Sequence, residues 1–128
     1  MKNACILVID KNPIDLRLAK EVLEFEGYRA LTTSTIQDAE TLIEEHKPDL
    51  ILIDYALPEK SALKLTKKLK TSPATKHHFL VALTGYSKEH MRIAMAAGSD
   101  GFIHKPIDTR SLAVKIAKLF ENHQTLPD

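Results

Sequence analysis

The chain has 128 residues, of which 44% are hydrophobic and 27% are charged, so it is long enough to bury a single core. Its 18 basic and 17 acidic residues leave a net charge of +1, which disfavours nucleic-acid binding and a polyacidic tail. One cysteine excludes an internal disulfide, and no apolar run approaches the roughly 20 residues of a membrane span. We expect one domain over residues 1–128, a cytoplasmic location, and neither nucleic acid nor membrane as a partner.

The first apolar run, residues 5–9, ends in an acid and leads into a helix. Asp10 closes the run, Asn12 is a favoured N-cap residue, and Pro13 suits the first helical position. Asp15 favours the first turn of the same helix. The residues expected on its buried stripe are Leu18, Ala19, Val22, Leu23 and Phe25, with Gly27 ending it. The pattern is strand, acidic loop, helix.

A second apolar run, residues 50–53, ends in Asp54 and shows no polar alternation. This pattern is typical of a central parallel strand covered on both faces, and Pro58 prevents its simple continuation. Open α/β sheets bind ligands at the carboxyl ends of their strands. Asp54 is therefore the residue that most needs an explanation.

The rest of the chain continues the alternation. Residues 28–31 form a weak predicted strand, and residues 35–38 resemble a capping box before the next helix. Strands predicted over 79–83 and 101–104 end beside Thr84 and Lys105. The other helices are expected around residues 62–69, 91–97 and 112–120, and the lysines of the first, Lys60, Lys64, Lys67, Lys68 and Lys70, are assigned to a solvated face. Five such units predict an α/β fold, a doubly wound parallel sheet with helices on both faces.

Four polar residues end four different predicted strands. They are Asp10, Asp54, Thr84 and Lys105, and a doubly wound sheet gathers them at one edge. Each alone has a plain alternative as an N-cap, a turn residue or a surface charge. Four residues at corresponding places favour a shared site.

Several motifs carry a family resemblance, namely Ile6–Asp10, Leu50–Asp54 with Leu57-Pro58, Ala82–Gly85 and Ala97–Pro106. Together they resemble the response-regulator receiver family of two-component signalling over essentially the whole chain. Residues 57–61 and 105–110 are most similar to single-domain receivers of the DivK type and to receiver modules of hybrid kinases. The resemblance implies a (βα)5 fold with the flavodoxin-like strand order 2-1-3-4-5.

The resemblance also implies a chemistry for these residues. Asp54 would accept a phosphoryl group from a phosphohistidine. Asp10, Asp54 and the backbone carbonyl of Ala56 would hold Mg²⁺, which prefers hard oxygen ligands. Thr84 would hydrogen-bond a phosphoryl oxygen, and Lys105 would neutralise its charge.

The same resemblance implies that the protein signals by contact with another protein. Phe102 stands at the place of the aromatic switch, and the Lys105-Pro106 bond is expected to be cis. The implied partners are a histidine kinase or histidine phosphotransferase and a downstream protein, which would dock on the helix at 91–97, the strand at Phe102 and the last helix. We expect a signalling protein and not an enzyme, as a monomer or weak dimer.

Lys11 departs from the family pattern, because most receivers have a second acid there that binds the metal directly. Two alternatives stay open: Lys11 forms an ion pair with Asp54 and weakens Mg²⁺ binding, or it points to solvent. The first would make the chain a degenerate receiver that binds partners without phosphorylation. A flavodoxin-like cofactor binder would share the fold, but the glycine-rich phosphate loop is absent, and His77-His78 has no convincing third metal ligand.

Overall fold

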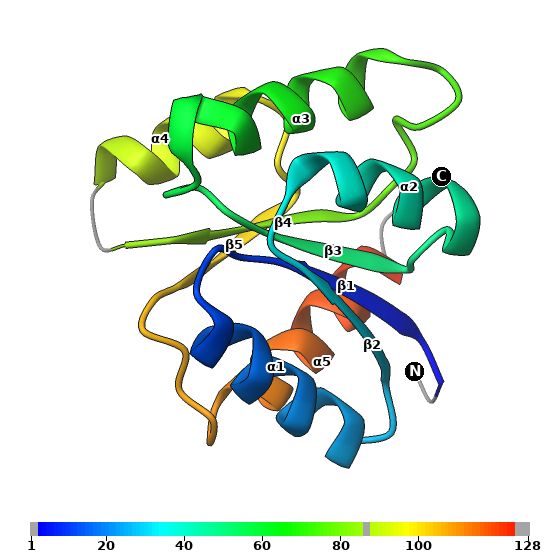
Figure 1. Cartoon of the computed structure of the whole chain (residues 1–128), viewed down its shortest axis with the longest axis vertical. Coiled ribbons are helices and arrows are strands. Elements are labelled where there is room, and N and C mark those ends of the chain that lie inside the picture. Colours follow the sequence, from blue (N-terminus) through cyan, green and yellow to red (C-terminus); the bar gives the residue numbers. More distant parts are fainter. Residues whose placement is uncertain (1–2, 86–87, 125–128) are drawn as a thin grey trace.

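The computed structural model describes residues 3–85 and 88–124, in which one parallel sheet is covered by helices on both faces (Figure 1). The strands are β1 (Cys5–Ile9), β2 (Arg29–Thr33), β3 (Leu50–Asp54), β4 (Leu80–Thr84) and β5 (Gly101–His104). The helices are α1 (Pro13–Phe25), α2 (Ile36–His46), α3 (Ser61–Thr71), α4 (Lys88–Ala96) and α5 (Leu112–Gln124), with a 3-10 turn, η1 (Pro58–Lys60), before α3. The order β2-β1-β3-β4-β5 confirms the expected topology.

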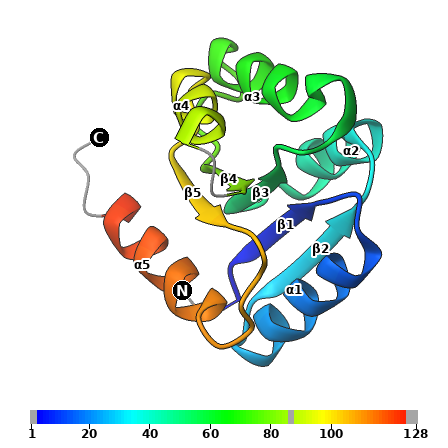
Figure 2. The same cartoon turned by 90° about the vertical axis from the view of Figure 1, so that its left-hand side faces the viewer.

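All neighbouring strands pair in parallel, so their carboxyl ends lie along one edge of the sheet. Figure 2 views the molecule from the side to which this carboxyl edge points. The loops that follow β1, β3 and β5 begin there, as does Gly85 after β4. This is the edge at which a doubly wound sheet binds ligands.

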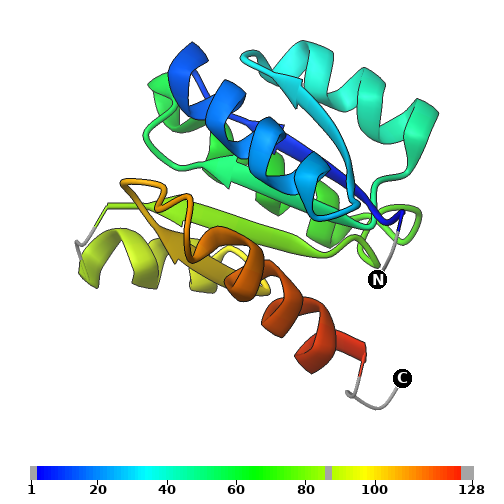
Figure 3. The same ribbon diagram turned by 90° about the horizontal axis from the view of Figure 1, so that it is seen from below.

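Two apolar cores cover the two faces of the sheet, because side chains along each strand point alternately to opposite faces. One core lies under α1 and α5, which pack beside each other in Figure 3, and it includes Ile6, Val8, Leu23, Leu52, Leu83 and Ile116. The other lies under α2 and α3 and includes Leu7, Ile9, Ile43, Ile51, Ile53 and Leu65. The uninterrupted apolar runs of β1 and β3 are thus buried on both sides.

Helix α1 begins as the sequence predicts, but one residue of its stripe was assigned to the wrong face. The Asn12 side chain accepts hydrogen bonds from the backbone N–H groups of Ile14 and Asp15, and Gly27 has the positive φ of 94° that favours glycine. Phe25, predicted to face inward, is 88% exposed. Two residues after the buried Leu23, it is rotated by about 200° around the helix axis and therefore faces away from the core.

The solvated lysine face of α3 also needs one correction. Lys70 is mostly buried, and its ammonium donates to the carbonyl oxygens of Lys76 and His78 and to Asp100 Oδ2. Its aliphatic stem lies so close to Gly98 that a Cβ there would come within 2.9 Å of Lys70 Cγ. Lys70 therefore fastens the end of α3 to the amino ends of β4 and β5. In the part of the chain described, no helix is both long and apolar enough to cross a membrane.

Candidate functional site

Asp10 and Asp54 lie side by side at the carboxyl edge, directly after the paired residues Ile9 and Ile53 of β1 and β3. Each uses the same local device: Asp10 Oδ1 accepts the backbone N–H two residues later at 2.9 Å, and Asp54 Oδ1 does likewise at 2.9 Å. The two side chains are 0% and 1% exposed. One oxygen of each buried carboxylate is thus held by the backbone, and the other remains for the site.

Lys105 joins these carboxylates from the end of β5. Its Nζ atom lies 2.7 Å from Asp10 Oδ2, 3.1 Å from Asp15 Oδ2 and 3.3 Å from Asp54 Oδ2. Its backbone N–H donates to the carbonyl oxygen of Thr84 at 2.6 Å, and the Lys105-Pro106 bond is cis, as expected. The structure therefore brings together the predicted residues of β1, β3, β4 and β5.

The electrostatics of the site are dominated by three acids around one ammonium. Burial by itself would lower the pKa of Lys105, but its interactions with Asp10, Asp15 and Asp54 outweigh this effect and raise the pKa. With all four groups ionised, the cluster carries a formal charge of −2. It attracts cations, although a lysine already lies within it.

Three buried oxygen atoms at this site have no hydrogen-bond partner in the described chain, although two of them lie near the Lys105 ammonium. Thr84 is 2% exposed, and its Oγ1 has no hydrogen-bond partner among the described residues. Asp54 Oδ2 and Asp10 Oδ2 face only the Lys105 ammonium. Since unsatisfied buried polar atoms are rare and costly, these atoms indicate a bound group that supplies both acceptors and positive charge.

Thr84 is placed by strand pairing. It follows Leu83, which is the register partner of Asp54, and it pairs with His104 of the neighbouring strand. Gly85 comes next, and a Cβ added there would meet no atom within 4 Å. The chain therefore leaves open space at Gly85, the residue after Thr84.

Lys11 turns away from the site, whereas Asp15 contacts it. Lys11 is exposed, and in the described chain it forms no ion pair with Asp54, so the solvent-facing alternative is the one observed. Asp15, interpreted only as a helix-start residue, reaches Lys105 from the first turn of α1. Asp15 is close to Asp10 in the sequence, which was a sign that it could join the site. Its contact with Lys105 could not be inferred without the direction of α1.

Phe102 lies on β5, in register with Ala82 of β4. It is 37% exposed, and its ring centroid is 5.3 Å from that of His104. The aromatic ring is therefore at the surface, and the pairing of His104 with Thr84 connects its strand to the site.

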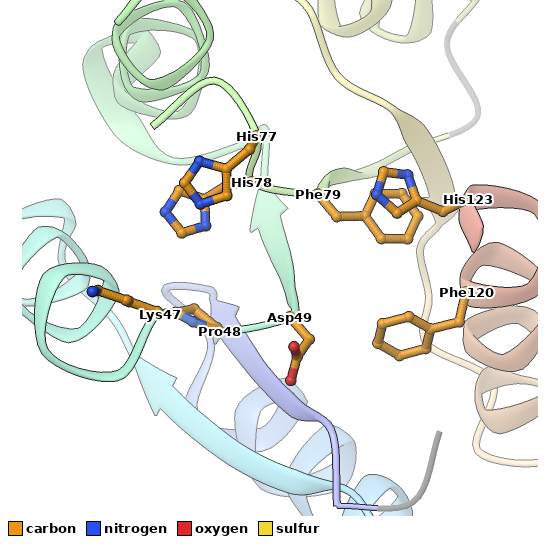
Figure 4. A pocket seen from close by; sticks show the side chains of 8 residues that line it. All are labelled: Lys47, Pro48, Asp49, His77, His78, Phe79, Phe120 and His123. Carbon is orange, nitrogen blue, oxygen red and sulfur yellow. The ribbon is translucent and has the colours of Figure 1, made fainter. Parts of the chain in front are cut away.

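A separate pocket of about 290 Å³ lies at the opposite, amino edge of the sheet (Figure 4). Its lining residues are Lys47, Pro48, Asp49, His77, His78, Phe79, Phe120 and His123. The rings of His77 and His78 are 4.3 Å apart, and His123 stacks on Phe79 at 4.0 Å. No group of three or more His, Cys, Asp or Glu in the described ranges is placed to hold a metal ion. None of the residues that line this pocket belongs to the Asp54 site.

Comparison with known proteins decides the family. The model of the response regulator receiver domain matches residues 6–117. The chain belongs to the response regulator receiver domains. It is 34% identical over 104 residues to the polar-differentiation response regulator DivK of Brucella anthropi, covering 80% of this chain and 84% of that protein.

Solved receiver structures have the same fold. A CheY-like response regulator receiver domain protein from Methanospirillum hungatei has a TM-score of 0.80 and 32% identity, with 94% of this receiver and 97% of that chain covered. The signal receiver domain of a histidine kinase from Syntrophus aciditrophicus has a TM-score of 0.82 and 25% identity, with 98% and 96% covered. The resemblance to receivers found in the sequence is confirmed.

Receiver domains typically bind Mg²⁺, and the donors of this receiver fit that ion in chemical type. Asp10 and Asp54 offer buried carboxylate oxygens, and backbone carbonyls such as that of Ala56 are also hard ligands. The acid usually found next to Asp10 is replaced by Lys11, which turns outward. The fit is therefore one direct ligand short, while an extra acid, Asp15, stands nearby.

Proposed function

We propose that this receiver accepts a phosphoryl group on Asp54 and passes the signal on by contact with another protein. The observation that carries the proposal is the buried carboxylate of Asp54, whose Oδ2 meets only Lys105, together with the unpartnered hydroxyl of Thr84 at the end of the neighbouring strand. Asp54 Oδ2 could carry a phosphoryl group, for which the Thr84 hydroxyl would supply a hydrogen bond and the Lys105 ammonium a positive charge. The donor would be a phosphohistidine of a histidine kinase or histidine phosphotransferase in the cytoplasm.

The transfer is a displacement at phosphorus. A carboxylate oxygen of Asp54 forms a bond to phosphorus as the bond from phosphorus to the donor imidazole nitrogen breaks, and the imidazole leaves with the electron pair and takes a proton. Lys105 would neutralise developing charge on the phosphoryl oxygens, and the Thr84 hydroxyl would donate a hydrogen bond to one of them. The backbone N–H of Ala56 keeps the attacking carboxylate oriented.

Mg²⁺ is part of this proposal. Asp10, Asp54 and the carbonyl of Ala56 would hold it, and it would supply further neutralisation of the phosphoryl group. Asp10 contributes a carboxylate whose Oδ1 is fixed by the backbone N–H of Asn12, so its second oxygen is oriented before any ion binds.

The direct test is phosphoryl labelling. Incubation with a small phosphodonor and Mg²⁺ should add one phosphoryl group to the wild-type chain, measured by intact mass, and Asp54→Asn should add none. Asp49→Asn is a matched control, because Asp49 ends the loop before β3 and its carboxylate binds the backbone N–H of Cys5 at the opposite edge. Labelling that survives Asp54→Asn would overturn the assignment of the phosphoacceptor.

Partner contact is proposed for the surface formed by α4, β5 and α5, which follow one another along the left side of Figure 2. Large apolar side chains are exposed there: Ile93, Met95, Phe102 and Val114. Thr84 pairs with His104 of β5, two residues after Phe102. A rearrangement at the Thr84 hydroxyl can therefore alter this surface. Amide-shift mapping with a beryllium fluoride analogue should move resonances here, whereas changes confined to the lysines of α3 would contradict the proposal.

The degenerate receiver remains the second candidate because Lys11 removes a direct metal ligand. On this alternative the wild type would take no phosphoryl label, and Lys11→Asp would restore labelling in an Asp54-dependent manner. Equal labelling of wild type and Lys11→Asp would show that Lys11 is a bystander and would exclude the degenerate receiver.

A further inference from the structure

Two acids of this chain occupy the same local position but differ in what they contact. Asp15 and Asp38 are both in the first turn of a helix, and each donates its backbone N–H to the side chain of the capping residue three positions earlier. Asp38 is exposed and forms no ion pair among the described residues. Asp15 is half-buried and lies 3.1 Å from the ammonium that also holds Asp10 and Asp54. A role at the helix start explains Asp38 completely and Asp15 only in part.

The charge of the site gives Asp15 a second role. Without it, Asp10, Asp54 and Lys105 would sum to −1, and a divalent cation would meet little net attraction. With Asp15 the sum is −2, the value that an acid at position 11 would have supplied in its place. The exposed Lys11 adds no ion pair to this cluster.

The acid cluster is accompanied by independent signs of a missing ligand. Thr84 Oγ1 and Asp54 Oδ2 are buried side-chain oxygens, on residues 2% and 1% exposed, and neither has a hydrogen-bond partner in the described chain. An ammonium shared by three carboxylates does not satisfy them. The site is therefore built for a further cationic or hydrogen-bonding group.

We infer that Asp15 replaces, from the first turn of α1, the metal-binding acid that this receiver lacks at position 11. Its carboxylate supplies the third negative charge that draws Mg²⁺ to Asp10 and Asp54, acting on the ion through the field of the site. The inference rests on the proposed phosphoacceptor function. It predicts that the wild-type receiver keeps useful Mg²⁺ affinity in spite of Lys11, because charge near a divalent ion matters even without direct coordination.

The test is a titration of the unmodified full chain with Mg²⁺ alone, followed by amide shifts of the loop after β1 and by calorimetry. Asp15→Asn should weaken Mg²⁺ binding about tenfold, the order of magnitude expected for one charge removed near a divalent ion. Asp38→Asn removes an equivalent helix-start charge and should leave the affinity unchanged. Asp15→Glu should retain most of the affinity, since it keeps the charge.

A rescue variant separates replacement from simple structural support. Lys11→Asp in the Asp15→Asn background restores an acid at the usual place and should recover the lost affinity. Unchanged affinity in Asp15→Asn, failure of this rescue, or no Mg²⁺ binding by the wild type would each overturn the inference. Thermal melts of each variant establish that the fold persists.

These failures are distinguishable from failure of the proposed function. Phosphoryl labelling of Asp54 is read by mass and does not require that Asp15 be the acid that attracts the ion. If labelling occurs and Asp15→Asn binds Mg²⁺ as the wild type does, the phosphoacceptor proposal survives and the role of Asp15 falls.

Discussion

Two lysine–aspartate clusters lie at opposite edges of the sheet and differ in how completely their polar atoms are satisfied. At the amino edge, the Lys70 ammonium has three acceptors, and Asp100 Oδ2 also accepts the backbone N–H of Leu80. At the carboxyl edge, Lys105 is shared by three carboxylates, and the nearby Thr84 hydroxyl has no partner in the described chain. The polar atoms of the first cluster are satisfied within the protein, whereas the second leaves buried oxygen atoms without hydrogen-bond partners in the described chain.

We interpret the first cluster as a structural ion pair and the second as part of the proposed functional site. Both lysines are mostly buried and both pair with an aspartate, so the burial and charge of the lysine alone do not distinguish the clusters. The satisfied cluster should contribute to the stability of the fold. The unsatisfied one should cost stability, which binding of a cation or phosphoryl group recovers.

The largest effect is expected from Lys70→Met, which keeps the aliphatic stem and removes the ammonium. It leaves Asp100 and two carbonyl groups without their donor, so the free energy of unfolding should fall by about 2–3 kcal/mol. Urea denaturation measures the change. Lys68→Met, on the exposed side of the same helix, is the control and should have little effect. A neutral result for Lys70→Met would remove the structural role given to the cluster.

Replacing one carboxylate in each cluster should give opposite signs. Asp100→Asn weakens a satisfied pair and should destabilise the fold by about 1–2 kcal/mol. Asp54→Asn relieves repulsion among three acids while keeping an oxygen for the N–H of Ala56, and should stabilise the apo protein by about 1 kcal/mol. Both are measured in urea without Mg²⁺. Destabilisation by both variants would show that the clusters do not differ in the proposed way.

Two buried threonines allow the same comparison on neutral groups. The Thr66 hydroxyl donates to the carbonyl oxygen of Ala62 and lies 2.6 Å from the Tyr55 hydroxyl, whereas that of Thr84 has no partner in the described residues. Thr66→Val should destabilise by about 1 kcal/mol, and Thr84→Val should be neutral or stabilise by a similar amount. Thr84→Val should also weaken binding of a beryllium fluoride analogue, which Thr66→Val should leave intact. Equal losses of stability would contradict the comparison.

The smallest effect concerns acid pH at the amino edge. Burial, then the neighbouring His77, lowers the pKa of His78, with a smaller contribution from Lys70, although a hydrogen bond to the backbone of Pro48 acts in the opposite sense. The unfolded chain therefore binds this proton more readily, so stability should decline as pH falls from about 7 to about 5. His78→Gln should flatten this part of the curve in pH-dependent melts. An unaltered curve would assign the decline to other groups.

The order of the elements and most of the site are specified by the amino-acid sequence alone. Uninterrupted apolar runs identify buried parallel strands, and residues that follow such runs must meet at one edge of the sheet. This pattern is sufficient to group Asp10, Asp54, Thr84 and Lys105. Local capping by Asn12 is equally readable, because it depends on neighbours within three residues.

Tertiary structure decided the contacts that depend on the directions of side chains. Lys11 and Asp15 are both charged residues beside Asp10, and only the packing of α1 against the sheet turns the first to solvent and the second toward Lys105. Lys70 likewise belongs to a lysine-rich helix face, yet the close approach of Gly98 and Asp100 buries it. Spacing in the sequence fixes the face of a helix on which a residue lies, but the position of that face relative to distant loops arises only when the elements pack together.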